Sequence, residues 1–272
     1  MATKPKILLV NDDGADASGL WVLFDKVRAI ADPVIVAPMR EQSARSQAVT
    51  VRHPMALNEI ERDGRAVGYR LDGTPADCVK LALARLFRDQ LKMVISGINW
   101  GANVGHNILY SGTVGAALEA AMYGLPAMAV SLRDEHPSPL HLETAAHVAC
   151  SLALDILAHG LPRGVILNVN VPDLPLSDVA GAVLTRQGQE TYIDLFETGE
   201  SDDGTRWCVN LGGERRQSPQ SDHPLDDLAL NERGVSITPL HFDLTSDDAL
   251  DVLRERIGKL NLATESDFPP SA

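Results

Sequence analysis

The segment from residue 7 to residue 14 constrains the fold of this chain more than any other feature. Its four apolar residues, 7–10, predict a short strand buried on both faces, as in a parallel sheet. Asn11, Asp12 and Asp13 follow at once, and Gly14 lets the backbone turn away. In open α/β sheets, ligands bind just beyond the carboxyl ends of the strands. The segment therefore predicts a parallel α/β sheet with a functional site at this edge.

Strand and helix patterns alternate along the chain as far as residue 175. Strand patterns occupy residues 6–10, 33–38, 93–95, 127–131 and 165–169, and helix patterns occupy residues 18–30, 75–86, 113–123 and 141–158. Two further ranges, 48–52 and 67–71, have the alternation typical of antiparallel strands. This rhythm predicts an α/β fold with a doubly wound, mostly parallel sheet.

Beyond residue 175 the helix patterns become rare. Residues 179–186, 206–211 and 235–238 have strand patterns, and the acidic, turn-rich range 197–227 predicts long loops or an arm. An amphipathic helix is expected over residues 247–260. We therefore expect a catalytic domain over residues 1–175 and a smaller β-rich extension with a C-terminal helix over residues 176–272.

The overall charge and the cysteine pattern exclude several classes of protein. A net charge of -13 argues against a protein that binds nucleic-acid polymers, which normally presents a basic face. The three cysteines are odd in number, widely spaced and without a CxxC motif, so they indicate reduced thiols. Residues 93–132 carry one charge but are dense in Gly, Asn and Ser, which argues against a membrane helix. We expect a cytoplasmic protein that does not bind membranes.

Side chains suited to metal binding follow three of the predicted parallel strands. Asp12 and Asp13 follow the first strand, Ser43 the second and Asn99 the third. Because parallel strands end at the same edge of a sheet, these four side chains are expected to converge. Two carboxylates with neutral oxygen ligands suit Mg²⁺ or Mn²⁺. A capped turn is the alternative interpretation of the acidic pair alone.

A glycine-rich loop over residues 97–105 leads to Ser111, Gly112 and Thr113 at the start of a predicted helix. The first N–H groups and the positive dipole end of a helix form a natural seat for a phosphate group. Hydroxyl groups of Ser111 and Thr113 would add donors. A flexible surface loop is the alternative. The segment is not a Walker loop, because no Gly-Lys-Ser/Thr sequence follows it.

These segments together resemble one family, the SurE (survival protein E) metal-dependent nucleotidases. The resemblance runs from residue 6 to about residue 245 and depends on several motifs in the same order and spacing. The matching segments are residues 10–14, 37–43, 73–79, 96–99, 111–114, 167–172 and 234–240.

The resemblance implies a Rossmann-like domain, one divalent metal ion per subunit and hydrolysis of nucleoside monophosphates to nucleoside and phosphate. A 5′-nucleotidase is implied, with 3′-nucleotidase and exopolyphosphatase as further activities to test. Members are typically dimers or tetramers, so the C-terminal arm is expected to mediate a homodimer or homotetramer. The implied metal ligands are Asp12, Asp13, Ser43 and Asn99, the set that the strand ends also indicate.

The expected catalytic residues are Asp12, Asp13 and Asn99, and one of the two aspartates would orient the attacking water. The expected phosphate contacts are Asn11, Asn103, Ser111, Gly112 and Thr113. Two roles stay open for Asn11, whose amide either orients the loop or reaches the phosphate. Two other mechanisms are also open: a phosphatase with a covalent phosphoaspartate, and a receiver-like signalling domain that binds metal or phosphate.

The chain departs from the family pattern in its glycine-rich loop. Many relatives carry an acidic residue where this chain has His106 and Asn107, so an acid or base role at that position is in doubt. His106 and Arg45 are candidates for substrate contacts, although solvent-facing side chains are the simpler interpretation. Trp100 is a candidate for stacking on a base because it follows Asn99.

Overall fold

The computed structural model describes residues 4–133, 136–139 and 141–257 of the chain. The chain divides into two compact units, Met1–Phe242 and Asp243–Ala272. The described helix of the second unit is α6 (Asp247–Ile257). The predicted continuation of this helix to residue 260 lies outside the described residues.

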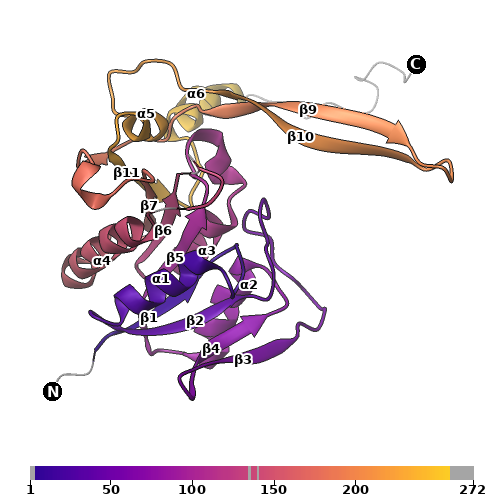
Figure 1. Ribbon diagram of the computed structural model, residues 1–272. Coiled ribbons are helices and arrows are strands. Elements are labelled where there is room, and N and C mark those ends of the chain that lie inside the picture. Colours follow the sequence, from indigo (N-terminus) through magenta and orange to yellow (C-terminus); the bar gives the residue numbers. More distant parts are fainter. Residues whose placement is uncertain (1–3, 134–135, 140, 258–272) are drawn as a thin grey trace. The chain divides into compact units, whose positions relative to one another are not determined.

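The first unit is built on a nine-stranded sheet whose strand order is β3-β4-β2-β1-β5-β6-β7-β11-β8 (Figure 1). Neighbouring strands from β4 to β7 are parallel, whereas β3 and β11 each run antiparallel to their neighbours β4 and β7. The strands are β1 (Lys6–Val10), β2 (Asp32–Pro38), β3 (Leu57–Arg62), β4 (Arg65–Leu71), β5 (Leu91–Trp100), β6 (Ala127–Leu132), β7 (Val165–Val171), β8 (Ala182–Leu184) and β11 (Val235–His241). The predicted α/β fold with a mostly parallel sheet is confirmed.

Helices cover both faces of this sheet, as expected for a doubly wound fold. Helices α1 (Ser18–Val27) and α4 (Leu142–His159) pack on one face, and α2 (Pro75–Leu81) and α3 (Gly112–Met122) pack on the other (Figure 1). Alternation along β1 divides its side chains between the two cores: Ile7 belongs to the first and Leu8 to the second. None of the helices in the described residues is long and apolar enough to cross a membrane.

Short helical turns complete the connections. A π-helical stretch, η1 (Ala82–Leu86), follows α2, and two 3-10 turns are η2 (Gly105–Leu109) and η3 (Leu176–Asp178). The start of α2 is fixed by a capping box, in which Thr74 Oγ1 accepts from Asp77 N and Asp77 accepts from Thr74 N. Thr74 is thus the N-cap of α2.

One predicted strand is wrong. Residues 48–52 form no strand, and the partner of β4 is β3 instead. The backbone of the 48–52 segment is held at the start of α2, where Thr74 Oγ1 donates to Ala48 O at 2.6 Å and Thr50 N donates to Asp77 at 2.9 Å. These side-chain contacts replace the ladder that the alternating pattern suggested.

The C-terminal part of the first unit extends the main sheet. Because β11 pairs with β7, and β8 with β11, the expected boundary at residue 175 does not separate two sheets. Helix α5 (Asp226–Asn231), which the sequence patterns did not predict, precedes β11.

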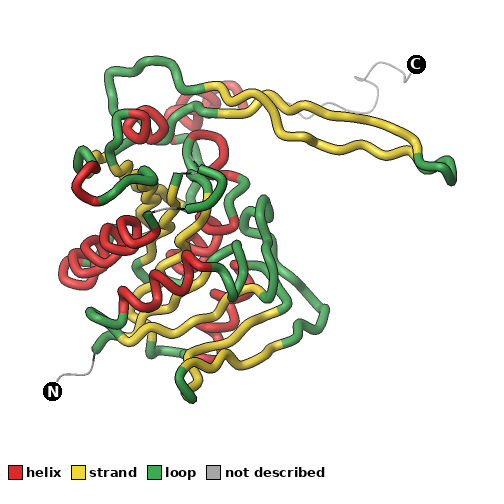
Figure 2. The backbone as a smooth tube through the Cα atoms, in the orientation of Figure 1, coloured by secondary structure: helices red, strands yellow, loops and turns green. Residues whose placement is uncertain are grey.

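A long antiparallel hairpin of β9 (Thr191–Glu200) and β10 (Arg206–Arg216) occupies much of the range where long loops or an arm were expected. Figure 2 shows these two strands running out from the base of the hairpin to a turn at its tip. Most hairpin side chains are exposed, which explains why no core-facing pattern marked β9 in the sequence.

Candidate metal and phosphate site

The predicted metal ligands lie at the ends of three adjacent strands. Strand β1 lies between β2 and β5 in the sheet, so the segments that follow these strands share one edge. Asp12 and Asp13 come directly after β1, and Ser43 lies in the loop that leaves β2. Asn99 was expected to follow β5 but is the penultimate residue of this strand. The strand extends to Trp100, beyond the apolar residues 93–95 that predicted it. The predicted adjacency of these strand ends is therefore present.

Asp12 is held against the start of α3. Its side chain accepts hydrogen bonds from the Thr113 backbone N–H, at 3.0 Å, and from the Thr113 hydroxyl. Gly112 passes so close that an added Cβ would lie 2.9 Å from Asp12 Cβ. Burial raises the pKa of Asp12, and the hydrogen bonds from Thr113 oppose this effect. The α3 start thus stabilises an anionic side chain of the protein itself.

This contact uses donors that were expected to face a phosphate group. Thr113 is fully buried and turned to Asp12, while Ser111 caps the helix by accepting from Val114 N at 3.1 Å. Of the predicted phosphate residues, Gly112 lies beside Asp12, and Ser111 precedes it as the N-cap of the same helix. Phosphate binding by this helix start stays a prediction.

Asp13 lies in a less favourable environment for a negative charge. Burial and the neighbouring Asp12 charge raise its pKa to about 7, and Glu41 adds to the repulsion. The Trp100 backbone N–H donates to Asp13 at 3.3 Å, which opposes the shift only in part. A divalent cation between these carboxylates would offset their repulsion, which is the environment expected of a metal site.

The neutral ligands fit such a cation by their chemistry. Asn99 donates its amide N–H to Gly101 O at 2.6 Å, so its amide oxygen is the atom suited to a metal. Ser43 is exposed and donates to Glu41 at 2.6 Å. In the described part of the chain, no group of three or more His, Cys, Asp or Glu residues is placed to hold a metal. The candidate site thus depends on two carboxylates and neutral oxygen atoms.

Glu41 is a site neighbour that the sequence patterns did not indicate. It follows β2, bonds to Ser43 and contributes to the raised pKa of Asp13. The adjacent Gln42 N–H donates to Asp12 O at 2.7 Å, which ties this loop to the acidic pair. The sequence signal that could have indicated Glu41 was its position two residues before Ser43, a predicted ligand.

Asn11 orients the loop that carries the acidic pair. It is fully buried, and its Nδ2 donates to Gly14 O at 2.8 Å across the turn. Among the described residues its Oδ1 has no hydrogen-bond partner. Of the two roles left open by the sequence, the structure contains the loop-orienting contact.

Asn103 is the centre of a buried polar network. Its N–H donates to Asn170 Oδ1 at 2.7 Å, its carbonyl accepts from Asn168 and Asn170, and its side chain donates to Ser131 at 2.8 Å. The supporting roles of Asn168 and Asn170 were not predicted from the sequence. Two asparagines at alternate positions of an otherwise apolar strand, β7, were the signal.

The remaining candidates are either exposed or packed against the core. His106 and Arg45 are exposed. Trp100 is half-buried and packs against the core that contains α1 and α4. The exposure of His106 and Arg45 agrees with the simpler interpretation of these two residues, and base stacking by Trp100 stays a prediction.

The amino-acid sequence of the chain matches a known protein family. The family model described as "Survival protein SurE" matches residues 7–194, more than half of the 272-residue chain. The chain belongs to the SurE family. The resemblance recognised in the sequence motifs is thereby confirmed.

Individual SurE relatives match over nearly their whole length. A protein named 5′-nucleotidase SurE from Syntrophus aciditrophicus is 41% identical over 254 residues, which cover 93% of this chain and 94% of the relative. Another protein of this name, from Syntrophobacter fumaroxidans, is 41% identical over 259 residues, covering 94% of this chain and 100% of the relative. The crystal structure of the SurE protein from Aquifex aeolicus superposes with a TM-score of 0.79 at 32% identity, covering 93% of this chain and 100% of that chain.

Proposed function

We propose that this SurE-family protein is a divalent-metal-dependent phosphomonoesterase that hydrolyses nucleoside monophosphates, a 5′-nucleotidase. The observation that carries the proposal is the pair Asp12 and Asp13, whose pKa values are both raised, at the end of β1 beside the start of α3. The name 5′-nucleotidase borne by relatives that match over more than nine-tenths of their length supports the substrate class.

The residues that would hold the metal are Asp12, Asp13, Ser43 and Asn99, through carboxylate, hydroxyl and amide oxygen atoms. Mg²⁺ and Mn²⁺ are the ions that such oxygen ligands favour. A bound divalent ion supplies charge neutralisation at phosphoryl oxygens and lowers the pKa of a coordinated water.

The protein's own groups have distinct roles in the proposed reaction. Thr113 fixes the Asp12 carboxylate, so that its orientation does not depend on substrate. Asp13, which is less buried, orients the attacking water and accepts its proton. Asn99 orients the substrate phosphoryl group. Ser111, Gly112 and Asn103 contribute donors to the phosphate oxygens, which stabilises the charge that these oxygens carry in the transition state.

The deciding experiment measures phosphate release from a panel of nucleoside 5′- and 3′-monophosphates and short polyphosphate. Each substrate is assayed with Mg²⁺, with Mn²⁺ and with EDTA. We expect metal-dependent release from 5′-monophosphates, and the other substrates measure the side activities. Release that persists at full rate in EDTA, after removal of bound metal, would contradict the proposal.

A matched pair of variants assigns the activity to the proposed site. Asp13→Asn should abolish both Mn²⁺ binding and phosphate release. Asp16→Asn is the control, because Asp16 lies three residues away, is exposed and pairs with Arg70 at 3.2 Å. The control should retain both properties.

A covalent phosphoaspartate is the alternative mechanism. Asp12 is only 4% exposed and both its oxygens are engaged by Thr113, which argues against its attack on phosphorus. The water mechanism predicts inversion of configuration at phosphorus with a chiral phosphoryl substrate. Net retention, or a trapped phosphoaspartate, would overturn it.

We also propose that the β9–β10 hairpin is the arm of a homodimer or homotetramer. Its exposed apolar side chains support this role, because large exposed apolar groups favour association. They are Tyr192, Ile193, Leu195, Phe196, Trp207, Val209 and Leu211. Sedimentation velocity should show an oligomer, and Phe196→Ser together with Trp207→Ser should reduce its size. An unchanged oligomer in this variant would contradict the assignment.

A further inference from the structure

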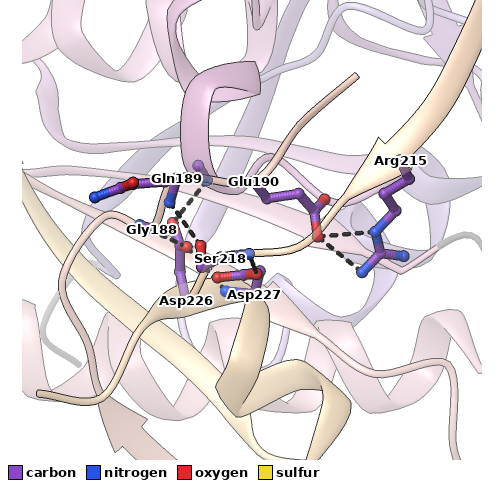
Figure 3. A network of polar contacts seen from close by, with 8 residues as sticks. Gly188, Gln189, Glu190, Arg215, Ser218, Asp226 and Asp227 are labelled. Atoms are coloured by element: carbon purple, nitrogen blue, oxygen red, sulfur yellow. Dashed lines mark hydrogen bonds and ion pairs between the residues drawn. The ribbon is translucent and has the colours of Figure 1, made fainter. Parts of the chain in front are cut away.

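A polar cluster, most of whose residues are buried, joins the base of the hairpin to α5 (Figure 3). We call it the hairpin-base cluster; it consists of Gly188, Gln189, Glu190, Arg215, Ser218, Asp226 and Asp227. Asp226 and Asp227 are fully buried. Adjacent buried carboxylates are costly unless their hydrogen-bonding capacity is used, so their contacts show what the cluster holds in place.

Asp226 connects two segments that are distant in the sequence. One carboxylate oxygen accepts from Gly188 N at 2.9 Å and from Asp227 N at 2.8 Å, both near the hairpin base. The other oxygen accepts from Gly105 N at 3.1 Å, in the glycine-rich loop. A single carboxylate therefore bonds the hairpin base on one side and the loop of the candidate active site on the other.

Neighbouring contacts fix the same part of the loop. His106 N donates to Glu190 O at 2.9 Å, and Gln187 Nε2 donates to Gly105 O at 2.8 Å. An added Cβ at Gly105 would lie 2.5 Å from Glu190 N and O, so the two backbones are in close contact. Arg215 holds the Glu190 side chain through two contacts of 2.8 Å (Figure 3). Two consecutive loop amides are thus bonded to the hairpin-base cluster.

This loop leads directly to the proposed catalytic groups. Gly105 begins η2, and six residues later Ser111 caps α3, whose start holds Asp12. At the end of the same turn, Tyr110 O accepts from Ser46 N at 2.9 Å, in the loop that carries Ser43. A displacement of Gly105 would therefore reach both the helix start and the predicted ligand Ser43.

We propose that Asp226 is a positioning residue for the proposed hydrolysis, a role that rests on the proposed function. By accepting the Gly105 N–H, it fixes η2 and thereby the α3 start and the Ser43 loop in the geometry that binds the substrate phosphate. Asp226 itself lies outside the reacting groups. Its effect arises because misplacement of a binding group by about 1 Å is sufficient to slow an enzyme.

Two isosteric substitutions separate this role from general stability. In Asp226→Asn, the amide oxygen can still accept from Gly188 and Asp227, but the NH₂ group then faces the Gly105 N–H and cannot accept from it. Asp227→Asn is the matched control. Asp227 is equally buried and adjacent, and its bond to Ser218 N, at 2.9 Å, does not involve the loop.

Three measurements on the full-length protein test the proposal. We expect Asp226→Asn to lower kcat/KM for the nucleoside monophosphate turned over best by about 10- to 100-fold. The inhibition constant of inorganic phosphate should rise in the same variant, and amide hydrogen exchange should accelerate over residues 105–110. In Asp227→Asn these three quantities should stay near their wild-type values, even if its melting temperature falls as far as that of Asp226→Asn.

Equal kinetics and equal exchange in the two variants would overturn the proposal, because a purely structural carboxylate affects stability alone. If Asp226→Asn does not fold, Gln187→Leu removes a second bond to Gly105 and should cause a smaller change of the same kind. Wild-type kinetics in a folded Gln187→Leu protein would then overturn it. If the wild-type protein shows no metal-dependent hydrolysis, the proposed function fails, and hydrogen exchange alone decides whether Asp226 holds the loop.

Discussion

Asp12 and Asp13 are adjacent, but their carboxyl groups lie in different electrostatic environments. Asp12 receives hydrogen bonds from the α3 start, whereas Asp13 receives one backbone donor and the repulsion of Asp12 and Glu41. A carboxyl group whose pKa is higher in the folded chain than in the unfolded chain destabilises the fold when it is ionised. For Asp13, whose ordinary pKa is 3.8, this cost develops as the pH rises and is complete above about 7.

Asp13→Asn should therefore stabilise the protein in EDTA at pH 8, although it removes the proposed activity. Each kcal/mol of relieved repulsion should raise the melting temperature by roughly 2–4 °C in a protein of this size. The advantage of the variant over wild type should shrink as the pH falls from about 7 toward 4, because the wild-type carboxyl group is then protonated. Thermal melts across this pH range measure the effect.

Added Mn²⁺ provides the internal control for this prediction. It should raise the melting temperature of the wild-type protein and leave that of Asp13→Asn unchanged, since only the former binds the ion. A variant that is less stable than wild type at pH 8 in EDTA would contradict the assigned electrostatic cost.

The Thr113 hydroxyl donates to the Asp12 carboxylate. Thr113→Val keeps the shape of the side chain but removes the donor to Asp12, which leaves a buried carboxylate oxygen with one bond fewer. We expect a loss of about 1–3 kcal/mol in the free energy of unfolding and weaker Mn²⁺ binding. Denaturant melts and calorimetric titration measure the two quantities, and Thr113→Ser, which retains the hydroxyl, should lie near wild type in both.

Among the elements, α3 and the loop after β2 are in direct contact. A Cβ added to Gly115, within α3, would lie 2.6 Å from Ser46 O and 3.1 Å from Gln47 Cα. Gln47 in turn donates to Glu119 of the same helix at 2.8 Å. The close approach of these backbones sets the position of the loop that carries Ser43.

Gly115→Ala should consequently destabilise the protein and weaken Mn²⁺ binding together. In an unobstructed helix interior, this change would stabilise the fold by about 0.5–1 kcal/mol. Here the loop backbone must move to accommodate the methyl group. Higher stability with unchanged Mn²⁺ affinity would show that the loop is not constrained by this contact.

The helices and strands were predictable where their side chains face a core. The parallel strands β1, β2, β6 and β7 appear within a few residues of their predicted bounds, since their apolar runs are buried. Residues 48–52 have the alternation of an antiparallel strand yet form no strand, because side chains at the start of α2 hold their backbone. Strand β9 escaped prediction because its side chains are mostly exposed and carry no core-facing signal.

The positions of the candidate site residues could be predicted as far as the order of the strands determines them. Because parallel strand ends share an edge, the sequence alone was sufficient to group Asp12, Asp13, Ser43 and Asn99 in one hypothesis. The contact of Asp226 with Gly105 spans 121 residues, and no local pattern specifies such a pairing. Glu41 was missed for a different reason, since a loop acid near a site resembles any solvated charge.

The net charge of the chain affects the approach of an anionic substrate. With a formal charge of -13, the protein repels a nucleotide dianion over a distance comparable to the screening length. Raising the ionic strength from about 0.02 M to about 0.2 M should therefore lower KM at saturating Mn²⁺, with a smaller effect on kcat. Initial-rate kinetics in an inert salt measure this, and a KM that rises steadily with salt would indicate a locally positive approach to the site.

The long-range bond between Gly105 and Asp226 also determines when, during synthesis, the site can be completed. A ribosome delivers the acidic pair and the α3 start early, but Asp226 emerges only after the hairpin strands. Until then the nascent chain holds the side chains proposed to bind the metal without the carboxylate that bonds to the loop beside them. A polypeptide that terminates before residue 226 would accordingly carry every proposed catalytic group and still lack that support, so the proposed activity would require synthesis of this later segment.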